Sequence, residues 1–434
     1  MTFQEDGGII MDGNRQQATG NRQQATGNRQ QATGNRQQAT GNRQQATGNS
    51  AFTIQSQTID WLRFLFILFV VFIHATPEVF DVSSIDFSRF TGNDFNTLLY
   101  SVIESIASIC NNGFFVFSGY LFFRNIQTFN RSTYTSKIKT RFFTLMIPYF
   151  LWQIIAVGLG VPQKIAGAIL KGSAQKMTLA EWFVELKGKG VLSIFWDYNM
   201  DTAASNIFGQ PTPASFSPYL YPFWFLQNLI MVSLLAPLFY IFIKNLKAFS
   251  LAILGALYLT GIWFVPIPQL SAVFFFAFGA YFGVFNKNLI LELRKYKTAL
   301  YFVTLTTFLC SLTISIFFAD KSGCADYIGH IFKFSCTLSS MVLASYWVES
   351  QKIKANQLLT KSIFFVYALH TIIVLPAADF IFSTITRHSD FWLADTIRFP
   401  FVTVTTTLVC VGIYWFLTQF QYLRPIAKVL SGNR

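Results

Sequence analysis

The sequence predicts an all-α, polytopic membrane protein with about ten transmembrane helices. Of its 434 residues, 52% are apolar and only 12% are charged, about half the charged fraction of a soluble domain. The apolar residues gather in repeated stretches of roughly 18–25 residues, a length that crosses a bilayer as a helix. These runs are continuous rather than alternating, which argues against a transmembrane β-barrel.

Residues 1–56 form a separate region that we expect to be a disordered tail. Between Asn14 and Gly48 the chain repeats one heptapeptide five times, Asn-Arg-Gln-Gln-Ala-Thr-Gly. No position of the repeat is strongly apolar, so it is not a coiled coil, and the recurring glycine argues against a long helix. No cleavable signal peptide is visible at the N-terminus. The membrane domain is predicted over residues 57–420, and a short basic cytoplasmic tail over residues 421–434.

The basic residues set the expected orientation. Lysine and arginine are concentrated in alternate loops and in the C-terminal tail, whereas the other short loops are mainly acidic. By the positive-inside rule both termini are cytoplasmic. The loop of residues 161–217 then lies outside, and we expect it to pack as short helices over the mouth of the bundle. The predicted spans are 58–76, 98–123, 141–160, 218–243, 248–265, 270–286, 298–319, 327–348, 361–383 and 399–419.

Composition and motifs exclude several classes of function. The +13 net charge does not indicate nucleic-acid binding, because the basic residues lie mostly in loops and tails where they orient the protein. Five scattered cysteines give neither a disulfide framework nor a metal-binding spacing. The nucleotide-binding glycine fingerprint, HExxH and GxSxG are all missing. We expect no nucleic-acid partner, no metal and no bound cofactor, and the sequence leaves the oligomeric state open.

Two ionisable residues lie inside the first apolar span, Arg63 and His74. They are eleven positions apart, about three helical turns, so they share one face and lie roughly 16 Å apart along the axis. A charge inside an apolar span costs about 2.5–3.5 kcal/mol on insertion scales, and such residues usually face a bundle interior or a wet cavity. We therefore expect this helix to wall a functional site. The alternative is that Arg63 snorkels to one interface and His74 lies near the headgroups.

The second span carries a polar stripe, Glu104, Ser108, Asn111 and Ser118, at i, i+4, i+7 and i+14. A polar stripe on a membrane helix faces protein or water rather than lipid. Glu104 enters from the outer end at a depth near that of His74, where a carboxylate would fix the imidazole tautomer. Equally, Glu104 could satisfy an arginine or lysine elsewhere in the bundle.

Three other places carry candidate site residues. In the ninth span Tyr367 precedes His370 by one turn, although a buried histidine more often satisfies a neighbour's hydrogen bond. Trp224 opens the fourth span, where nearby amides suit hydrogen bonds between helices. A short basic run at the inner entrance of the third span consists of Lys137, Lys139 and Arg141. They form a topology signal, or an anchor for the phosphates of a cytosolic donor.

Five motifs, taken in chain order, resemble the acyltransferase-3 family of integral membrane acyltransferases. They are Ile59-Asp60-Trp61-Leu62-Arg63 through His74, Phe114 through Leu121 (FFVFSGYL), Lys139-x-Arg141 with Pro148-Tyr149, Phe223-Trp224-Phe225-Leu226, and Phe364 through His370 (FFVYALH). Each motif alone is weak, but the ordered set is specific and covers residues 55–420. Two features depart from the family pattern: Phe64 is bulky where a small residue is frequent, and the repetitive tail is foreign to it.

The resemblance implies a membrane O-acyltransferase that moves an acyl group, usually acetyl, onto a hydroxyl. The donor would be cytosolic acetyl-CoA or another acyl-CoA, and the acceptor a cell-surface carbohydrate or its lipid-linked precursor, at the bacterial inner membrane. It implies that His74 is the general base, with Glu104 as candidate orienter, and that Arg63 binds the anionic donor or the developing oxyanion. The other assignments are Lys139 and Arg141 to the donor, and Asn111, Ser118, Trp224, Tyr367 and His370 to substrate.

A secondary transporter or flippase of envelope precursors is the main alternative. Ten helices with buried ionisable residues also suit proton-coupled translocation. Transporters often contain internal repeats, however, and the two halves of this sequence show none. Solute uptake into vesicles without an acyl donor would favour transport. A purely structural scaffold is disfavoured by the buried ionisable groups.

Overall fold

The computed structural model describes residues 52–76, 81–170, 191–196, 200–205, 211–215, 218–318, 322–386 and 392–432. The heptapeptide repeats, predicted to be disordered, lie outside these residues. The chain from Gln55 onward forms one compact unit, and residues 1–54 are assigned to a separate one. The first described helix, Phe52–Ala75, begins a few residues before the predicted boundary of the membrane domain.

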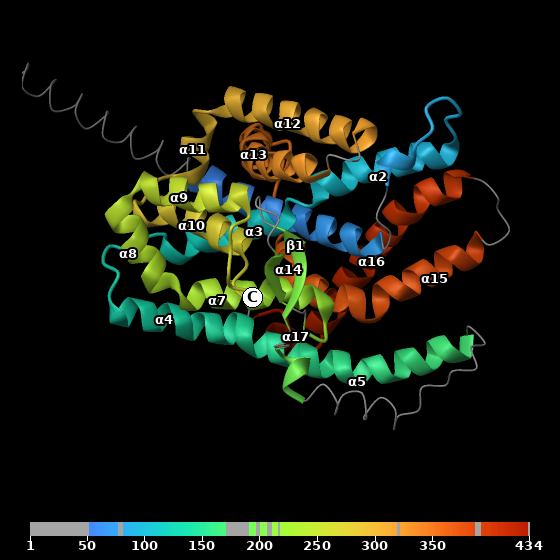
Figure 1. The fold of residues 1–434 in the computed structure, drawn as a ribbon. Helices are drawn as coiled ribbons and strands as arrows, with labels where there is room; N and C mark the ends of the chain where they lie inside the picture. Colours follow the sequence, from blue (N-terminus) through green and yellow to red (C-terminus); the bar gives the residue numbers. More distant parts are fainter. Residues whose placement is uncertain are drawn as a thin grey trace, which may run out of the picture. The chain divides into compact units, whose positions relative to one another are not determined.

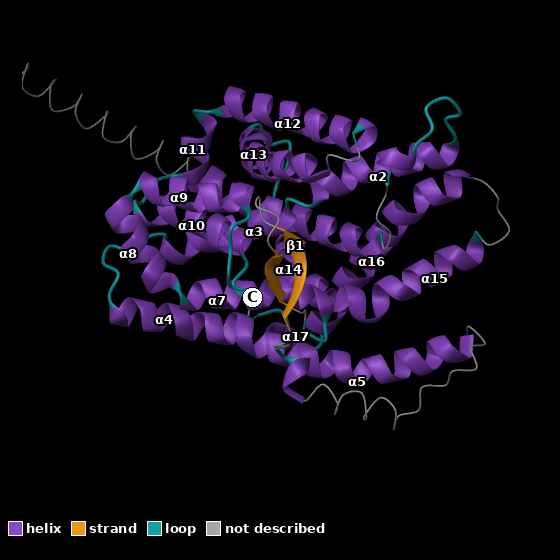
Figure 2. Ribbon diagram, viewed as in Figure 1, coloured by secondary structure: helices purple, strands orange, loops and turns teal. Residues whose placement is uncertain are grey.

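The all-α class is confirmed, and each of the ten predicted spans coincides with a helix or a bent helix pair in the described residues (Figures 1 and 2). Seven described helices are long and apolar enough to cross a membrane. The pair α7–α8, bent by 61°, is an eighth candidate, and α9 and α10 are shorter apolar helices. The number of crossings and the side of the termini stay predictions.

The elements follow each other in this order. After the first helix come α2 (Gly92–Ala107), α3 (Cys110–Phe123), α4 (Arg131–Arg141), α5 (Ile147–Leu170), α7 (Trp224–Leu234), α8 (Ala236–Leu246), α9 (Ala248–Thr260), α10 (Leu270–Val284), α11 (Leu289–Arg294), α12 (Lys297–Phe317), α13 (Ser322–Glu349), α14 (Gln357–Leu369), α15 (Leu375–Ile385), α16 (Trp392–Gln419) and α17 (Arg424–Leu430). The π-helical segments Phe142–Met146 and His370–Val374 join α4 to α5 and α14 to α15. Short 3-10 turns are η1 (Val82–Ser84), η3 (Val191–Ile194) and η4 (Tyr221–Phe223).

Side-chain caps fix where several of these helices begin. Thr91 and Asp94 form a capping box on α2, in which each side chain accepts a hydrogen bond from the other residue's backbone N–H. At α4, the Asn130 side chain accepts from the Thr133 N–H at 2.9 Å. This cap sets the register of the helix that carries Lys137 and Arg141.

The long loop between the third and fourth spans differs from our expectation of short helices. In its described part α5 continues as far as Leu170, and the single turn η3 follows. Strands β1 (Met200–Ser205) and β2 (Pro211–Ser215) then form an antiparallel hairpin with a bulge between Thr202 and Ala204 (Figure 2). Residues 171–190 of this loop, with their aromatic side chains, lie outside the described residues.

The residues predicted as a C-terminal tail include α17, which packs on α5. The Trp152 indole N–H donates to the Leu430 carbonyl oxygen at 2.9 Å. Gly432 has a φ of +76°, and a Cβ there would lie 2.6 Å from the Thr144 carbonyl oxygen. Backbone of this kind requires glycine, so the chain end is fitted against the start of α5.

Helices α3 and α10 pack with their backbones in near contact (Figure 1). A Cβ on Gly119 would lie 2.0 Å from the Phe276 carbonyl oxygen, and one on Gly279 would lie 1.9 Å from the Val116 carbonyl oxygen. Small residues permit such approaches between membrane helices. The Ser-Gly-Tyr motif of the second span therefore contributes tight packing through its glycine.

We expect Gly119→Ala to destabilise the fold by about 3 kcal/mol, the upper range for overpacking, because the added methyl meets backbone atoms that cannot move aside. The measurement is the yield of monodisperse protein and its melting temperature in detergent. Gly412→Ala in α16 is the matched control, since its Cβ has no neighbour within 4 Å. Equal melting temperatures for the two variants would contradict the packing argument.

The first helix is held in one rotational setting by contacts on α3. A Cβ on Gly113 would lie 2.1 Å from the Phe66 ring, and Phe66 stacks on Phe117 with ring centroids 5.9 Å apart. The fully buried Gln55 side chain donates to the Tyr120 hydroxyl and accepts from the Ile290 N–H at 3.3 Å. This rotation about the helix axis determines which face of the first helix is turned to the candidate active site.

Candidate active site

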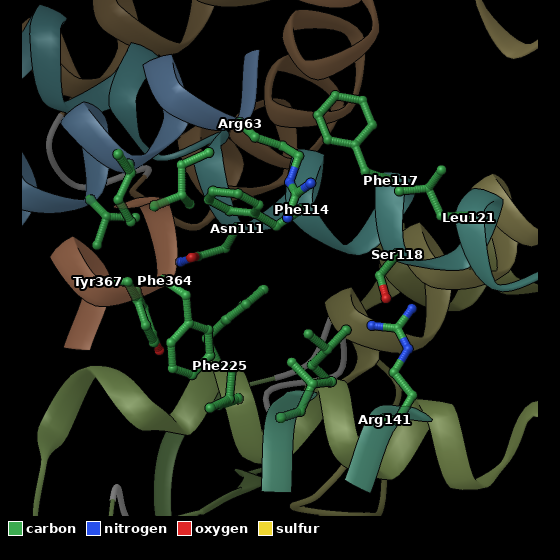
Figure 3. A pocket seen from close by; sticks show the side chains of 16 residues that line it. Arg63, Asn111, Phe114, Phe117, Ser118, Leu121, Arg141, Phe225, Phe364 and Tyr367 are labelled. Carbon is green, nitrogen blue, oxygen red and sulfur yellow. The ribbon is translucent and has the colours of Figure 1, made fainter. Parts of the chain in front are cut away.

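A partly open cavity of about 200 Å³ lies between the first helix, α3, the α4–α5 junction, α7 and α14. Figure 3 shows the Arg63 and Arg141 guanidinium groups reaching it from opposite walls, with Asn111, Ser118 and Tyr367 around it. Five predicted site residues from four separate spans thus line one cavity. The apolar part of the wall consists of Ile67, Val70, Phe114, Phe117, Leu121, Leu145, Phe225, Leu226, Leu229, Ile363 and Phe364.

The first helix presents one continuous face to this cavity. Arg63, Ile67 and Val70 line it at i, i+4 and i+7, and His74 follows one turn later on the same face. The Arg63 guanidinium lies 3.9 Å from the Asp60 carboxylate, and its side chain is 18% exposed. Arg63 therefore brings a cation inward, and the cavity stops one turn short of His74.

The polar stripe of the second span is divided between two places. A break at Ser108 and Ile109 separates α2 from α3, and only Asn111 and Ser118 reach the cavity. The Ser118 hydroxyl is buried and makes no hydrogen bond to any described residue. Glu104, on α2, instead interacts electrostatically with Lys333 of α13. No hydrogen bond joins its carboxylate to His74 among the described residues, so the pairing with a cation elsewhere is the favoured alternative.

His74 meets a second histidine beyond the end of the cavity. Its ring centroid lies 5.3 Å from that of His370, with the planes tilted by 42°. The Tyr221 ring packs edge-on against His74 at 5.9 Å and is 62% exposed. His74 is partly buried, whereas His370 is fully buried. The structure thus brings the end of the first predicted span next to the middle of the ninth at one pair of imidazoles.

The basic residues of α4 fall on different faces. Arg141 lines the cavity and is close enough to Arg63 for their charges to repel, while Lys139 is exposed and lies outside the cavity wall. Two residues apart on a helix means roughly 200° of rotation, which explains the difference. Lys137, one turn before Arg141 in the same basic run, shares the face of Arg141.

Lys137 lines a second, open hollow of about 590 Å³ at the surface. Arg124 lines it too, and no acidic residue is among its lining side chains. Leu121 belongs to the walls of both the hollow and the cavity, so the two spaces are neighbours. The remaining residues of the hollow are Asn125, Ile126, Gln127, Thr128 and Thr133.

A family model described as an acyltransferase domain, acyltransferase 3, matches residues 56–415. The chain belongs to the acyltransferase-3 family. It is therefore a multi-pass membrane O-acyltransferase in the general sense, and the matched segment contains the cavity, the histidine pair and both arginines. No curated protein and no solved structure matches the chain.

Two other predicted residues of the acyltransferase have structural contacts that define their places. The Tyr367 hydroxyl donates to the Pro222 carbonyl oxygen, and its ring stacks on Phe223 at 5.4 Å, so the ring rather than the hydroxyl faces the cavity. Trp224 does not line the cavity, whereas its neighbour Phe225 does. In this motif the residue that reaches the cavity is therefore Phe225, and a substrate contact of Trp224 stays a prediction.

The described part of the acyltransferase contains no group of three or more histidine, cysteine, aspartate or glutamate side chains that could hold a metal ion. What the site offers is two cations in an apolar cavity, an unpartnered serine hydroxyl, and two imidazoles beyond the far end. Such a set suits the binding of an extended anionic molecule with proton transfer at one end of it.

Proposed function

We propose that the protein transfers an acetyl group from cytosolic acetyl-CoA to a hydroxyl of a cell-surface carbohydrate or its lipid-linked precursor, in the bacterial inner membrane. The observation that carries the proposal is the cavity with Arg63 and Arg141 at one end and the His74–His370 pair one turn beyond the other. Along the first helix Arg63 and His74 are roughly 16 Å apart. An extended phosphopantetheine arm is of comparable length and would span that separation.

The donor side is supported by the line of positive charge. Lys137 interacts electrostatically with Arg141, and Arg141 with Arg63, so the charges lead from the surface hollow to the cavity. Each of these cations could bind one phosphate group of the donor. Arginine can bind a phosphate group through two parallel hydrogen bonds. The nucleotide would occupy the hollow, and the arm would pass beside Leu121 into the apolar space.

In the proposed reaction His74 acts as the general base. The acceptor hydroxyl oxygen attacks the thioester carbonyl carbon while His74 takes the hydroxyl proton. The new C–O ester bond forms as the C–S bond breaks, and the imidazolium returns the proton to the departing thiolate. His74 is partly buried beside the exposed Tyr221, so an acceptor would reach it from the predicted outer side.

The decisive test is acetyl transfer by the full-length protein in lipid nanodiscs. Acetyl-CoA carrying an isotope label is supplied with envelope glycan from a strain that lacks the gene, and mass spectrometry follows the label. The proposal expects acetyl-sized mass gains on the glycan, removable by mild base as expected for an ester. Unchanged ester content of envelope glycans after gene deletion, together with no label transfer, would overturn it.

We expect Lys137→Gln to raise the KM for acetyl-CoA about tenfold, because it removes one charge-assisted contact to a donor phosphate. The kcat should change little, since Lys137 is remote from the histidines. Acetyl-pantetheine, which lacks the phosphates, should be used equally well by variant and wild type. Lys139→Gln is the matched control: the same charge is lost from the same helix, but from an exposed position outside the hollow. Equal KM values for both variants would refute the donor path.

A further inference from the structure

The hydrogen bonds of His370 determine which of its nitrogens carries the proton. Its Nδ1 lies 2.8 Å from the Tyr367 carbonyl oxygen and 3.1 Å from the Val366 carbonyl oxygen. Carbonyl oxygens only accept hydrogen bonds, so Nδ1 must carry the hydrogen. In the neutral ring Nε2 then presents a lone pair. That nitrogen is buried and has no hydrogen-bond partner among the described residues.

The local backbone at His370 is irregular, and its ring lies beside that of His74. His370 begins the π-helical segment that ends at Val374, and the Leu375 N–H bonds to the His370 carbonyl oxygen across this wide turn. A π-turn inserts one residue into a helix and redirects the side chains around it. The ring is 0% exposed, and the His74 ring lies 5.3 Å away.

The ring spacing suits a hydrogen bond between the two imidazoles. An N–H···N bond of about 3 Å places two ring centres about 5 Å apart, because each nitrogen lies roughly 1 Å from its ring centre. At the observed 5.3 Å, rotation of the His74 ring would suffice to form such a bond without a shift of either helix. The His74 nitrogens make no hydrogen bond to a described residue that such a rotation would break.

We propose that His370 is the positioning residue for His74: its Nε2 accepts a hydrogen bond from one nitrogen of the His74 ring. The bond holds the other His74 nitrogen, with its lone pair, toward the acceptor hydroxyl, and it stabilises the imidazolium after proton transfer. This inference rests on the proposed acyl transfer. It gives His370 the orienting task for which Glu104 was the candidate.

A neutral acceptor fits this place better than a carboxylate. The surroundings are apolar, and burying an ionised group there costs far more than burying a neutral one. A merely structural His370 would need only its Nδ1 bond within the helix. The buried, unpartnered Nε2 beside the other imidazole is the feature that a structural role leaves unexplained.

The test compares two amide substitutions that each keep one nitrogen's function. The His370→Asn amide can reach the backbone carbonyls that Nδ1 contacts, whereas the longer His370→Gln side chain can place an oxygen near the Nε2 position. We expect His370→Asn to lower kcat by roughly 10²-fold and His370→Gln to restore about tenfold of that loss. The KM for acetyl-CoA should stay within twofold for both, because neither change touches the arginines.

His370→Phe, which keeps the ring volume and removes both nitrogens, should match His370→Asn if it folds. Size-exclusion profiles and acetyl-CoA binding by each purified variant check the fold. If the kcat of His370→Asn equals or exceeds that of His370→Gln, the role of His370 is its hydrogen bond within the helix, and the inference is overturned. Wild-type levels of transfer by every variant would also overturn it while leaving the proposed function intact. Absence of acetyl transfer by the wild-type protein would instead contradict the proposed function.

Discussion

Replacing His74 by alanine is expected to lower acetyl transfer by about 10²–10⁴-fold, the range that one general base contributes. The loss should appear in kcat, because the proposed donor contact at Arg63 lies three turns away from His74. The ring makes no hydrogen bond to a described residue, so its removal should leave membrane insertion and melting temperature near the wild-type values. The measurement is label transfer in nanodiscs, with ester content of envelope glycans in cells.

A histidine elsewhere in the bundle provides the matched control for this prediction. His330 in α13 packs its ring against Tyr258 at 5.0 Å and does not line the cavity. Alanine at position 330 removes the same chemical group from a membrane helix, and transfer should stay within a few-fold of wild type. Comparable losses at both positions would mean that His74 acts through the fold rather than as the base.

The elements of the fold were predictable because each depends on a local signal. Apolar runs of bilayer length gave all ten helical segments, since a lipid environment leaves backbone groups no partner except the helix itself. Helical period also placed Arg63 and His74 on one face, and the face is the one turned to the cavity. The division of the second span at Ser108 was not predicted, because the residues there carry no proline or glycine to signal a break.

Helical periodicity could not predict which helices pack against one another. A period states which residues share a face, but not which other helix opposes it. Glu104 and His370 both had a suitable depth for an orienting partner, and the structure distinguishes them: Glu104 interacts electrostatically with Lys333 of α13, and His370 lies beside His74. The same limit explains why Phe225 rather than Trp224 reaches the cavity. The resemblance to the acyltransferase-3 family is confirmed by the family match over residues 56–415, whereas the roles of the individual residues stay predictions.

The second large effect is expected on substitution of Arg63. The kinetic constant that changes also decides whether the guanidinium binds the donor or stabilises the oxyanion. If the guanidinium binds donor phosphate, Arg63→Gln should raise the KM for acetyl-CoA by roughly 10–10²-fold, the value of losing one or two charge-assisted bonds. Transfer from acetyl-pantetheine should then be little affected. If the guanidinium stabilises the oxyanion, kcat should fall with both donors.

The geometry favours the first outcome. His74 lies three turns from Arg63, which is too far for both side chains to act on one carbonyl group. Arg63→Lys should recover only part of the donor affinity, because an ammonium cannot form the paired hydrogen bonds of a guanidinium. Arg131→Gln, which removes an exposed arginine at the start of α4, controls for the change in net charge and should leave both kinetic constants as in wild type. A kcat loss of equal size with acetyl-CoA and acetyl-pantetheine would contradict donor binding by Arg63 and would place its guanidinium at the reacting carbonyl group instead.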